Sequence, residues 1–213
     1  MEFKETADLL NAVGVKTTYT PDRLEEVRSP YENYYLLQRE GEKWAYGLFI
    51  QERQNKPYLS VKETFETKKE GSRFFFLKRL SNYYFFKVIE PFKRAHKEME
   101  FGKRTVEKLY RALNIAGIPK KLFYVDQKPN HRAIVLETKG NDYAIAFYGM
   151  NGKKVHATFS HPDFPLELDE ALFFSFSEVF LLHLFETEVE ALLQKENVDV
   201  RFTDEDVKNF ILG

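Results

Sequence analysis

Three residues that could bind a metal ion lie close together in the second half of the chain: His156, His161 and Asp163. Histidine and carboxylate groups are ordinary metal ligands. His156 and His161 are, however, separated by an odd number of residues, which on an extended strand places their side chains on opposite faces. We therefore expect solvent-exposed and turn residues here, and we expect the chain to hold no metal and no other cofactor.

Other catalytic patterns are absent from the sequence. The chain has no cysteine, which excludes thiol nucleophiles, thiolate metal sites and disulfides. No serine lies in a Gly-x-Ser-x-Gly turn. Gly140, Gly149 and Gly152 lack the strand-loop-helix spacing of a phosphate-binding loop and are typical of turns. These observations favour a protein that is not an enzyme.

Glu178 and His183 interrupt the most apolar stretch of the chain. A buried ionisable pair would indicate a functional site. Five residues apart on a helix, the two side chains point in different directions, and Glu178 shares a flank with Ser175, Glu186 and Glu190. We interpret this flank as a stripe that faces water.

Charge gives little support to binding of a polyanion. The chain has 32 Lys and Arg against 33 Asp and Glu, for a formal net charge of −1. Basic pairs interleaved with aromatic residues could bind single-stranded nucleic acid, but acidic residues lie between them, so a solvated helix surface is the favoured interpretation. The pairs are Lys68-Lys69, Lys78-Arg79, Lys93-Arg94 and Lys103-Arg104.

The sequence contains an internal repeat. Leu9–Val15 matches Ala112–Ile118 at an offset of 103 residues, and Leu36–Phe49 matches Val135–Tyr148 at an offset of 99. A third match has an offset of 96 and places Ser81, Glu90 and Ala95 on Ser177, Glu186 and Ala191. Matches that keep one order along the chain indicate a duplicated unit.

Each copy shows the same pattern of elements. A helix stopped by Gly14 or Gly117 opens the copy, with Thr105 as the cap of the second helix. A hairpin follows, with its turn at Glu40-Gly41 or Gly140-Asn141, and then a further strand. These strands are expected over residues 34–39, 43–52 and 57–65 in the first copy and 121–125, 133–138, 142–150 and 153–160 in the second.

Each copy then closes with a long helix, over about residues 72–98 and 169–196. Apolar residues cover almost the whole circumference of both helices, so each must be covered on more than one side. We expect Pro91 to kink or split the first helix. A strand over residues 198–202 and a helix over 204–212, capped by Thr203, would end the chain.

The predicted fold is therefore α+β: a tandem duplication of a helix, an antiparallel sheet of three or four strands, and a long helix. The two long apolar helices would pack together against the sheets about a pseudo-two-fold axis. The predicted repeats cover residues 1–100 and 101–197 and form one compact unit, and residues 198–213 form a C-terminal extension.

The two copies differ most in their loops, where specificity commonly resides. The first copy has extra residues between Thr20 and Tyr31, and the second has a loop with two prolines at residues 161–165. The predicted binding residues come from these two loops: Arg23, Glu26, Arg28, Tyr31, His161 and Asp163.

The function favoured by the sequence is a non-enzymatic intracellular adaptor that binds a protein partner, of a bacterial immunity or anti-defence type. The bias toward lysine, glutamate and phenylalanine indicates a bacterial source, and the missing cysteines and the absence of a secretory signal indicate the cytoplasm. The alternative is nucleic-acid binding by a duplicated curved sheet, which resembles the saddle of the TATA-binding protein in fold alone. We expect no association with a membrane.

Overall fold

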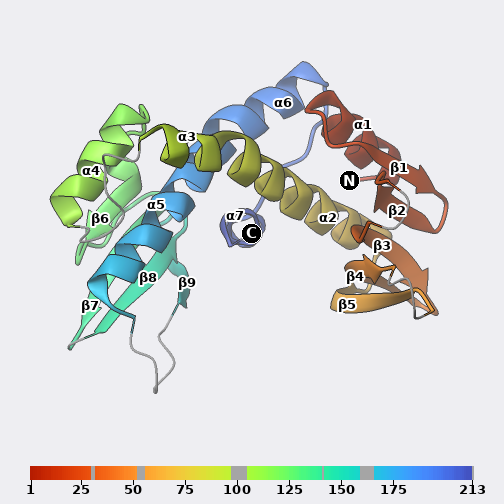
Figure 1. The fold of residues 1–213 in the computed structure, drawn as a ribbon, viewed down its shortest axis with the longest axis horizontal. Helices are drawn as coiled ribbons and strands as arrows, with labels where there is room; N and C mark the ends of the chain where they lie inside the picture. Colours follow the sequence, from red (N-terminus) through yellow and green to blue (C-terminus); the bar gives the residue numbers. More distant parts are fainter. Residues whose placement is uncertain (30–31, 52–55, 97–104, 141, 159–165, 213) are drawn as a thin grey trace. The chain divides into compact units, whose positions relative to one another are not determined.

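The structure is a computed structural model, and it describes residues 1–29, 32–51, 56–96, 105–140, 142–158 and 166–212. The fold is α+β, with two sheets and long helices (Figure 1). The chain divides into two compact units. The first unit holds Met1–Leu80 and Leu192–Val200, and the second holds Ser81–Ala191 and Arg201–Gly213. The repeat boundaries after residues 100 and 197 remain a prediction, because the two units are defined by how residues pack and not by similarity between the two halves of the sequence.

The first unit opens with helix α1 (Phe3–Ala12), which ends where Gly14 takes a positive φ of 96°. A five-stranded antiparallel sheet follows in the order β1-β2-β3-β4-β5. Its strands are β1 (Thr17–Thr20), β2 (Arg23–Glu26), β3 (Tyr34–Glu40), β4 (Lys43–Ile50) and β5 (Tyr58–Phe65). Helix α2 (Lys68–Tyr84) comes next.

Both helices of the first unit pack on one face of this sheet, which we call the inner face. Phe3 of α1 contacts Trp44, and Phe74 and Phe75 of α2 contact Tyr46. Residues directly opposite one another in antiparallel strands share a face, so the register assigns the rest of the inner face to Leu24, Glu26, Tyr35, Leu37 and Leu48. The other face, called the outer face, carries Arg23, Glu25, Tyr34, Leu36, Gly47, Phe49, Leu59 and Val61.

The second unit has a four-stranded sheet in the order β6-β7-β8-β9. The strands are β6 (Phe123–Val125), β7 (Ala133–Lys139), β8 (Asp142–Tyr148) and β9 (Lys154–Thr158). The helices of the described chain after α2 are η1 (Phe85–Ile89), α3 (Glu90–Ala95), α4 (Val106–Ile115), η3 (Lys120–Leu122), α5 (Leu168–Leu184), η4 (Phe185–Val189), α6 (Glu190–Lys195) and α7 (Asp204–Ile211). The prediction of a wholly antiparallel second sheet is wrong, because β6 runs parallel to β7.

Both long helices change from α to π geometry near their C-terminal ends, at η1 and at η4. Pro91 is the second residue of α3, separated from the end of η1 by Glu90, in the first turn of that helix, where its missing N–H is tolerated. The second helix has no proline at this place and still contains a π segment of the same length. Proline is therefore not required for the interruption. Within the second unit, Phe92 of α3 packs on Phe176 and Phe180 of α5, so the end of the first long helix meets the second.

The bounds of the elements follow the spacing of the internal repeat only in part. α1 and α4 begin 103 residues apart, and β3 and β7 begin 99 apart, as the sequence predicts. The long helices begin 100 residues apart rather than 96. The cap at Thr105, the turns at Gly41 and Gly140, and the cap at Thr203 are confirmed. The strand predicted over residues 198–202 is wrong, since these residues form no regular element.

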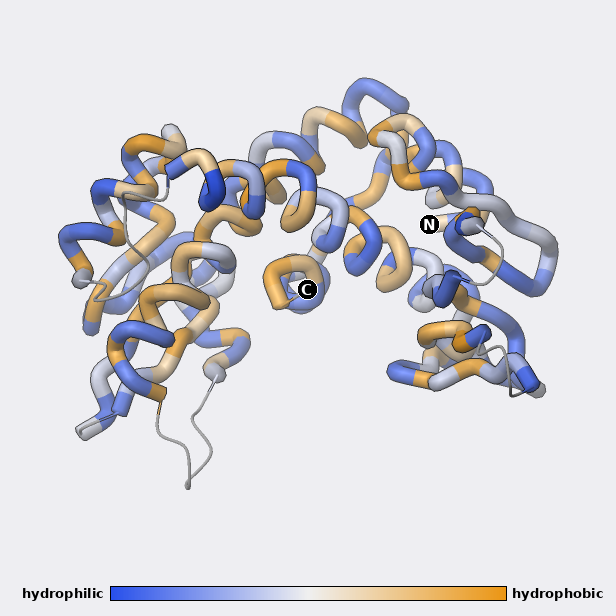
Figure 2. The backbone as a smooth tube through the Cα atoms, in the orientation of Figure 1, coloured by the Kyte–Doolittle hydropathy of each residue, from blue (hydrophilic) through white to orange (hydrophobic). Residues whose placement is uncertain are grey.

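The long helix α5 and the strand β2 differ in their pattern of burial. In α5 nine residues are buried around the helix, whereas β2 buries alternate residues, Leu24 and Glu26. Figure 2 shows the contrast: the β1–β2 hairpin is largely hydrophilic, and hydrophobic residues recur along α5. A charged residue that is buried in this way needs a partner of opposite charge or a hydrogen bond, because burying an unpaired charge costs free energy.

Candidate functional site

The predicted binding residues fall into two groups. Arg23 and Glu26 lie on β2, and Arg28 lies just beyond its end. Tyr31, His161 and Asp163 lie outside the described residues. The stretch predicted as an asymmetric loop between Thr20 and Tyr31 is in part a strand, because β2 pairs with both β1 and β3.

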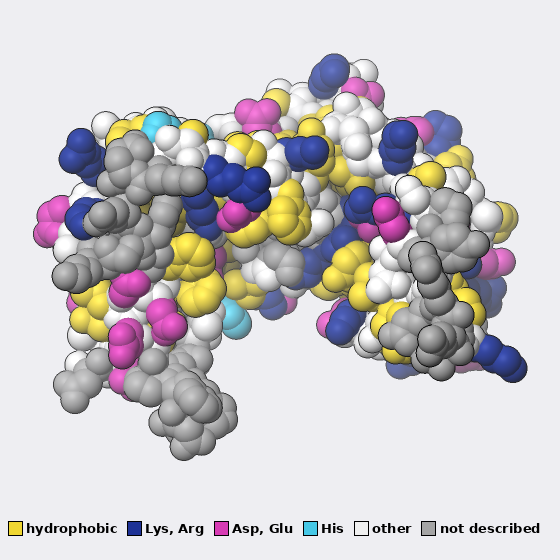
Figure 3. Space-filling model, viewed as in Figure 1, with side chains coloured by type: hydrophobic (Ala, Val, Ile, Leu, Met, Phe, Trp, Pro, Cys, Tyr) yellow, Lys and Arg dark blue, Asp and Glu magenta, His cyan; other side chains and the backbone are white. Residues whose placement is uncertain are grey.

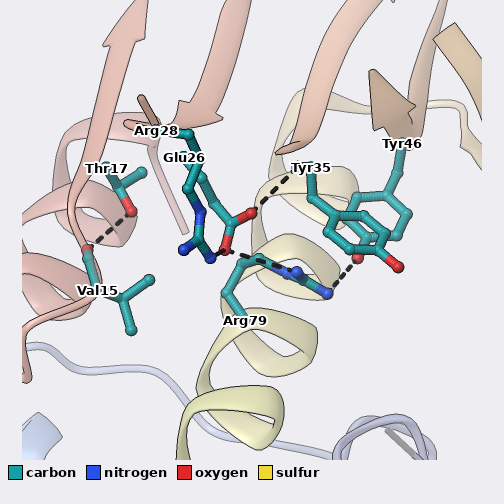
Figure 4. Close-up of polar contacts among 7 residues, drawn as sticks. All are labelled: Val15, Thr17, Glu26, Arg28, Tyr35, Tyr46 and Arg79. Carbon is teal, nitrogen blue, oxygen red and sulfur yellow. Dashed lines mark hydrogen bonds and ion pairs between the residues drawn. The ribbon is translucent and has the colours of Figure 1, made fainter. Parts of the chain in front are cut away.

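Glu26 is the centre of a buried ion-pair cluster, which we define as Glu26, Arg28 and Arg79 (Figure 4). One carboxylate oxygen of Glu26 lies 3.6 Å from Nη1 of Arg79 and accepts a 3.2 Å hydrogen bond from Arg28. The other accepts a 3.1 Å hydrogen bond from the backbone N–H of Tyr35. Glu26 therefore ties the β1–β2 hairpin to β3 and to α2 at once.

Arg79 is buried and has a second set of contacts. Its guanidinium lies 3.7 Å from the ring centroid of Tyr35, and its Nη2 donates a 2.9 Å hydrogen bond to the hydroxyl of Tyr46. Burial raises the pKa of Tyr46, so the phenol stays protonated. The site thus holds two guanidinium groups against one carboxylate. Glu26 and Arg79 are shielded from solvent, and their contacts hold the hairpin against β3 and α2.

A second group, the outer-face cluster, is formed by Arg23, Glu25, Tyr34 and Phe49. The Arg23 guanidinium carbon lies 5.9 Å from the ring centroid of Tyr34 and 5.4 Å from that of Phe49. Arg23 also donates a 2.6 Å hydrogen bond to the Tyr34 hydroxyl and lies 2.6 Å from the Glu25 carboxylate. Tyr34 and Phe49 are directly opposite on β3 and β4, with ring centroids 5.3 Å apart. Burial raises the pKa of Tyr34.

The outer-face cluster lies on the face that α1 and α2 do not cover. Arg23 was among the predicted binding residues, but its aromatic neighbours Tyr34 and Phe49 were not; they lie 11 and 26 residues farther along the chain. The pairing of Tyr34 with Phe49 could have been predicted from the sequence. The turn at Gly41 sets the register of the hairpin formed by the predicted strands 34–39 and 43–52, and in that register the two residues are opposite one another.

Two further polar clusters lie in the second unit. Glu137, Tyr148 and Lys154 form one on its sheet: Tyr148 donates a 2.9 Å hydrogen bond to Glu137, and Lys154 lies 2.5 Å from the same carboxylate. Burial alone would raise the pKa of Glu137, but these two hydrogen bonds leave it lowered. In the other, Asp204 joins Arg132 to the backbone N–H of Met150. Within the described ranges, no group of three or more histidine or acidic residues could hold a metal ion.

The expected water-facing stripe on the second long helix is wrong in part. Ser175 is buried, and Glu178 is partly buried, with no hydrogen bond or ion pair to any described residue. Burial raises the pKa of Glu178 to about 8. Glu190, farther along the flank, is exposed as predicted.

No family model, no curated protein and no solved structure matches this chain. Of the helices in the described part of the chain, none combines the length and the apolar character needed to cross a membrane.

Proposed function

We propose that this protein is a non-enzymatic adaptor that binds a protein partner through the outer face of the first unit's sheet. The observation that carries the proposal is the outer-face cluster, in which Arg23 is held against Tyr34 and Phe49 on a face that neither α1 nor α2 covers. Tyrosine and arginine are the residue types that most often carry the energy of protein interfaces. Their side chains are partly buried already, so less entropy is lost on binding.

The buried ion-pair cluster supports this proposal from the inner face. It fixes β2, and with it Arg23, relative to β3 and α2 through contacts of the Glu26 carboxylate. A binding residue held in this way is pre-organised for its partner. Arg28, which is exposed, would extend the contact surface beyond the end of β2.

Nucleic-acid binding is the alternative, and the charges do not favour it. The Glu25 carboxylate lies 2.6 Å from Arg23 and offsets its charge. On the face drawn in Figure 3, Lys and Arg side chains lie interspersed with Asp and Glu rather than forming a field of one sign. Phosphate binding depends on an excess of positive charge.

Internal duplication is part of the same proposal. Two observations support it. Both halves of the chain contain, in the same order, a helix, a hairpin, a further strand and a long helix with a π segment. The starts of α1 and α4 are 103 residues apart, and the starts of β3 and β7 are 99 residues apart. In this interpretation the β1–β2 hairpin is the feature that the second copy lacks, and it carries the residues that bind the partner.

The proposal is tested by pull-down from an extract of the native host, with the wild type beside Arg23→Glu and Phe49→Ala. We expect the wild type to recover one stoichiometric partner and both variants to lose it. Each substitution should remove at least about 2 kcal/mol of binding free energy, which raises the Kd about 30-fold. The matched control is Lys4→Glu, which reverses an exposed charge on α1. Recovery of no stoichiometric partner, or equal recovery by all four proteins, contradicts the proposal. Retention of single-stranded DNA at low salt that Arg23→Glu abolishes would favour the alternative.

A further inference from the structure

The turn between β8 and β9 contains the one Asn-Gly pair of the sequence, Asn151-Gly152. Asparagine before glycine is the pair at which proteins deamidate most readily, because glycine has no side chain to shield its amide nitrogen from the neighbouring carboxamide. The Asn151 side chain is exposed, so water reaches it. The pair therefore meets the covalent requirement for deamidation, and the geometry of the turn decides whether the reaction proceeds.

Deamidation starts when the backbone nitrogen of Gly152 attacks Cγ of Asn151. A bond forms between these two atoms, the bond from Cγ to the side-chain nitrogen breaks, and ammonia leaves with the proton of the Gly152 nitrogen. The product is a succinimide ring, which water opens to aspartate or isoaspartate at position 151. Nothing is oxidised or reduced, and water is the co-reactant. The rate therefore depends on how easily the Gly152 nitrogen can turn toward the carboxamide.

The folded turn holds the Gly152 nitrogen in place. Its N–H donates a 3.0 Å hydrogen bond to the carbonyl of Gly149, and the N–H of Gly149 donates a 2.9 Å hydrogen bond to the carbonyl of Lys153. Gly152 is buried, with a φ of 62°, and it lies so close to the Pro129 carbonyl that a Cβ at position 152 would clash with it. The nitrogen can reach the Asn151 carboxamide only when the turn opens.

Asp204, the first residue of α7, holds the other side of the turn. One of its carboxylate oxygens accepts a 3.1 Å hydrogen bond from the backbone N–H of Met150, and the other accepts a 2.8 Å hydrogen bond from Nε of Arg132. Gly149 lies so close to this carboxylate that a side chain at position 149 would displace it. Opening of the turn therefore requires that Asp204 release the residue before Asn151.

We infer that Asn151 is a deamidation site controlled by α7: the folded turn suppresses the reaction, and release of Met150 by Asp204 permits it. The inference is independent of any binding partner. The product fits the turn poorly. Aspartate at position 151 places a negative charge next to the residue that Asp204 binds, and isoaspartate adds a methylene group to the backbone of the turn. Both weaken the contacts that suppress the reaction, so deamidation favours the open turn.

The test incubates the full chain in mildly alkaline buffer and follows conversion of Asn151 by peptide mapping and mass spectrometry. A synthetic peptide of residues 147–156 gives the rate without the fold. We expect the wild type to react at least about tenfold more slowly than the peptide, and Asp204→Ala to react at least about threefold faster than the wild type. Glu205→Gln is the matched control, because it removes a negative charge from an exposed residue in the same turn of α7, and it should react like the wild type.

Hydrogen exchange of the Gly152 N–H, measured by NMR in the wild type, keeps the test informative if Asp204→Ala does not fold. Exchange and deamidation require the same opening, so the two should be slowed by the same factor relative to the peptide. Wild type that reacts as fast as the peptide overturns the inference, as does another asparagine that reacts before Asn151. Equal rates for Asp204→Ala and Glu205→Gln, both folded, overturn the role of α7.

The consequence for the fold is tested with variants of Asn151 itself. Asn151→Asp has the charge of the deamidated product, and we expect it to lower the melting temperature by a few degrees relative to Asn151→Ser, which carries no charge. Equal melting temperatures for these two variants would show that the charge of the product does not open the turn.

Discussion

The stability of this protein should fall as the pH rises from 5 to 8, and Glu178 should be a major cause. Its carboxylate is partly buried on α5 without a partner among the described residues, and burial raises its pKa from 4.5 to about 8. A group whose pKa is raised by folding binds its proton more tightly in the folded state. Its contribution is therefore fully present below about pH 4.5 and is lost as the pH rises through 8.

The magnitude follows from the shift. Each pKa unit corresponds to about 1.4 kcal/mol, so a rise from 4.5 to about 8 gives an upper limit of about 5 kcal/mol lost across the window. Partial exposure of the side chain reduces this, and we expect about 2 to 4 kcal/mol. Two neighbours on the same long helix also titrate. Burial raises the pKa of Glu186, which acts in the same direction, and lowers that of His183, which acts in the opposite direction below pH 6.5.

Glu178→Gln isolates the contribution of this one group, because glutamine has the shape of the protonated acid and cannot ionise. Urea unfolding followed by circular dichroism at pH 5, 6.5 and 8 should give nearly equal free energies of unfolding for the two proteins at pH 5. The variant should be increasingly more stable toward pH 8. Glu170→Gln, at an exposed position on the same helix, measures the effect of removing a negative charge alone. A difference between Glu178→Gln and wild type that stays constant from pH 5 to 8 would refute the reasoning.

Three substitutions test the packing around the polar clusters. Arg79→Ala should lower the free energy of unfolding by about 3 kcal/mol, because Glu26 would lose its buried cation and keep only the exposed Arg28, and the Tyr46 hydroxyl would lose its donor. Arg79→Lys should restore little of this, as followed by Trp44 fluorescence. Gly149→Ala should cost about 1 to 3 kcal/mol, since a side chain there would displace the Asp204 carboxylate; an unchanged melting temperature would contradict this. Thr203→Ala should cost about 1 kcal/mol by removing the cap of α7, whereas the serine variant should melt like the wild type.

Most helices and hairpins could be predicted because each has a local signal. Glycines at positive φ end α1 and α4 and form the hairpin turns, and the spacing of apolar residues matches the elements between them. The β1–β2 hairpin gave no such signal. Its strands contain mostly threonine, arginine and glutamate, and of the four residues of β2 only Leu24 is an apolar core residue. A strand that buries a charge in place of an apolar side chain breaks the alternation on which sequence prediction depends.

The candidate site was predictable to the same limited extent. Position in an asymmetric segment led to the prediction that Arg23, Glu26 and Arg28 bind a partner, and the structure places these residues on or beside β2. The partners that give these residues their roles are distant in sequence: Arg79 lies 53 residues beyond Glu26, and Phe49 lies 26 beyond Arg23. Such contacts depend on strand order and on the face that a helix covers, and neither can be read from residue spacing.

The strand that precedes the central hairpin runs in opposite directions in the two sheets: β2 is antiparallel to β3, and β6 is parallel to β7. A strand parallel to its neighbour requires a return segment, and in the second unit that segment lies between Val125 and Ala133 and contains the buried Pro129. A strand antiparallel to its neighbour requires only a short connection, and on the outer face of the first unit Leu36 is buried while Tyr34 and Phe49 are partly exposed. Within this antiparallel arrangement the carboxylate of Glu26 joins β2 to β3 and α2. The buried Glu26–Arg79 pair on the inner face thus fixes the strand that carries Arg23 on the outer face.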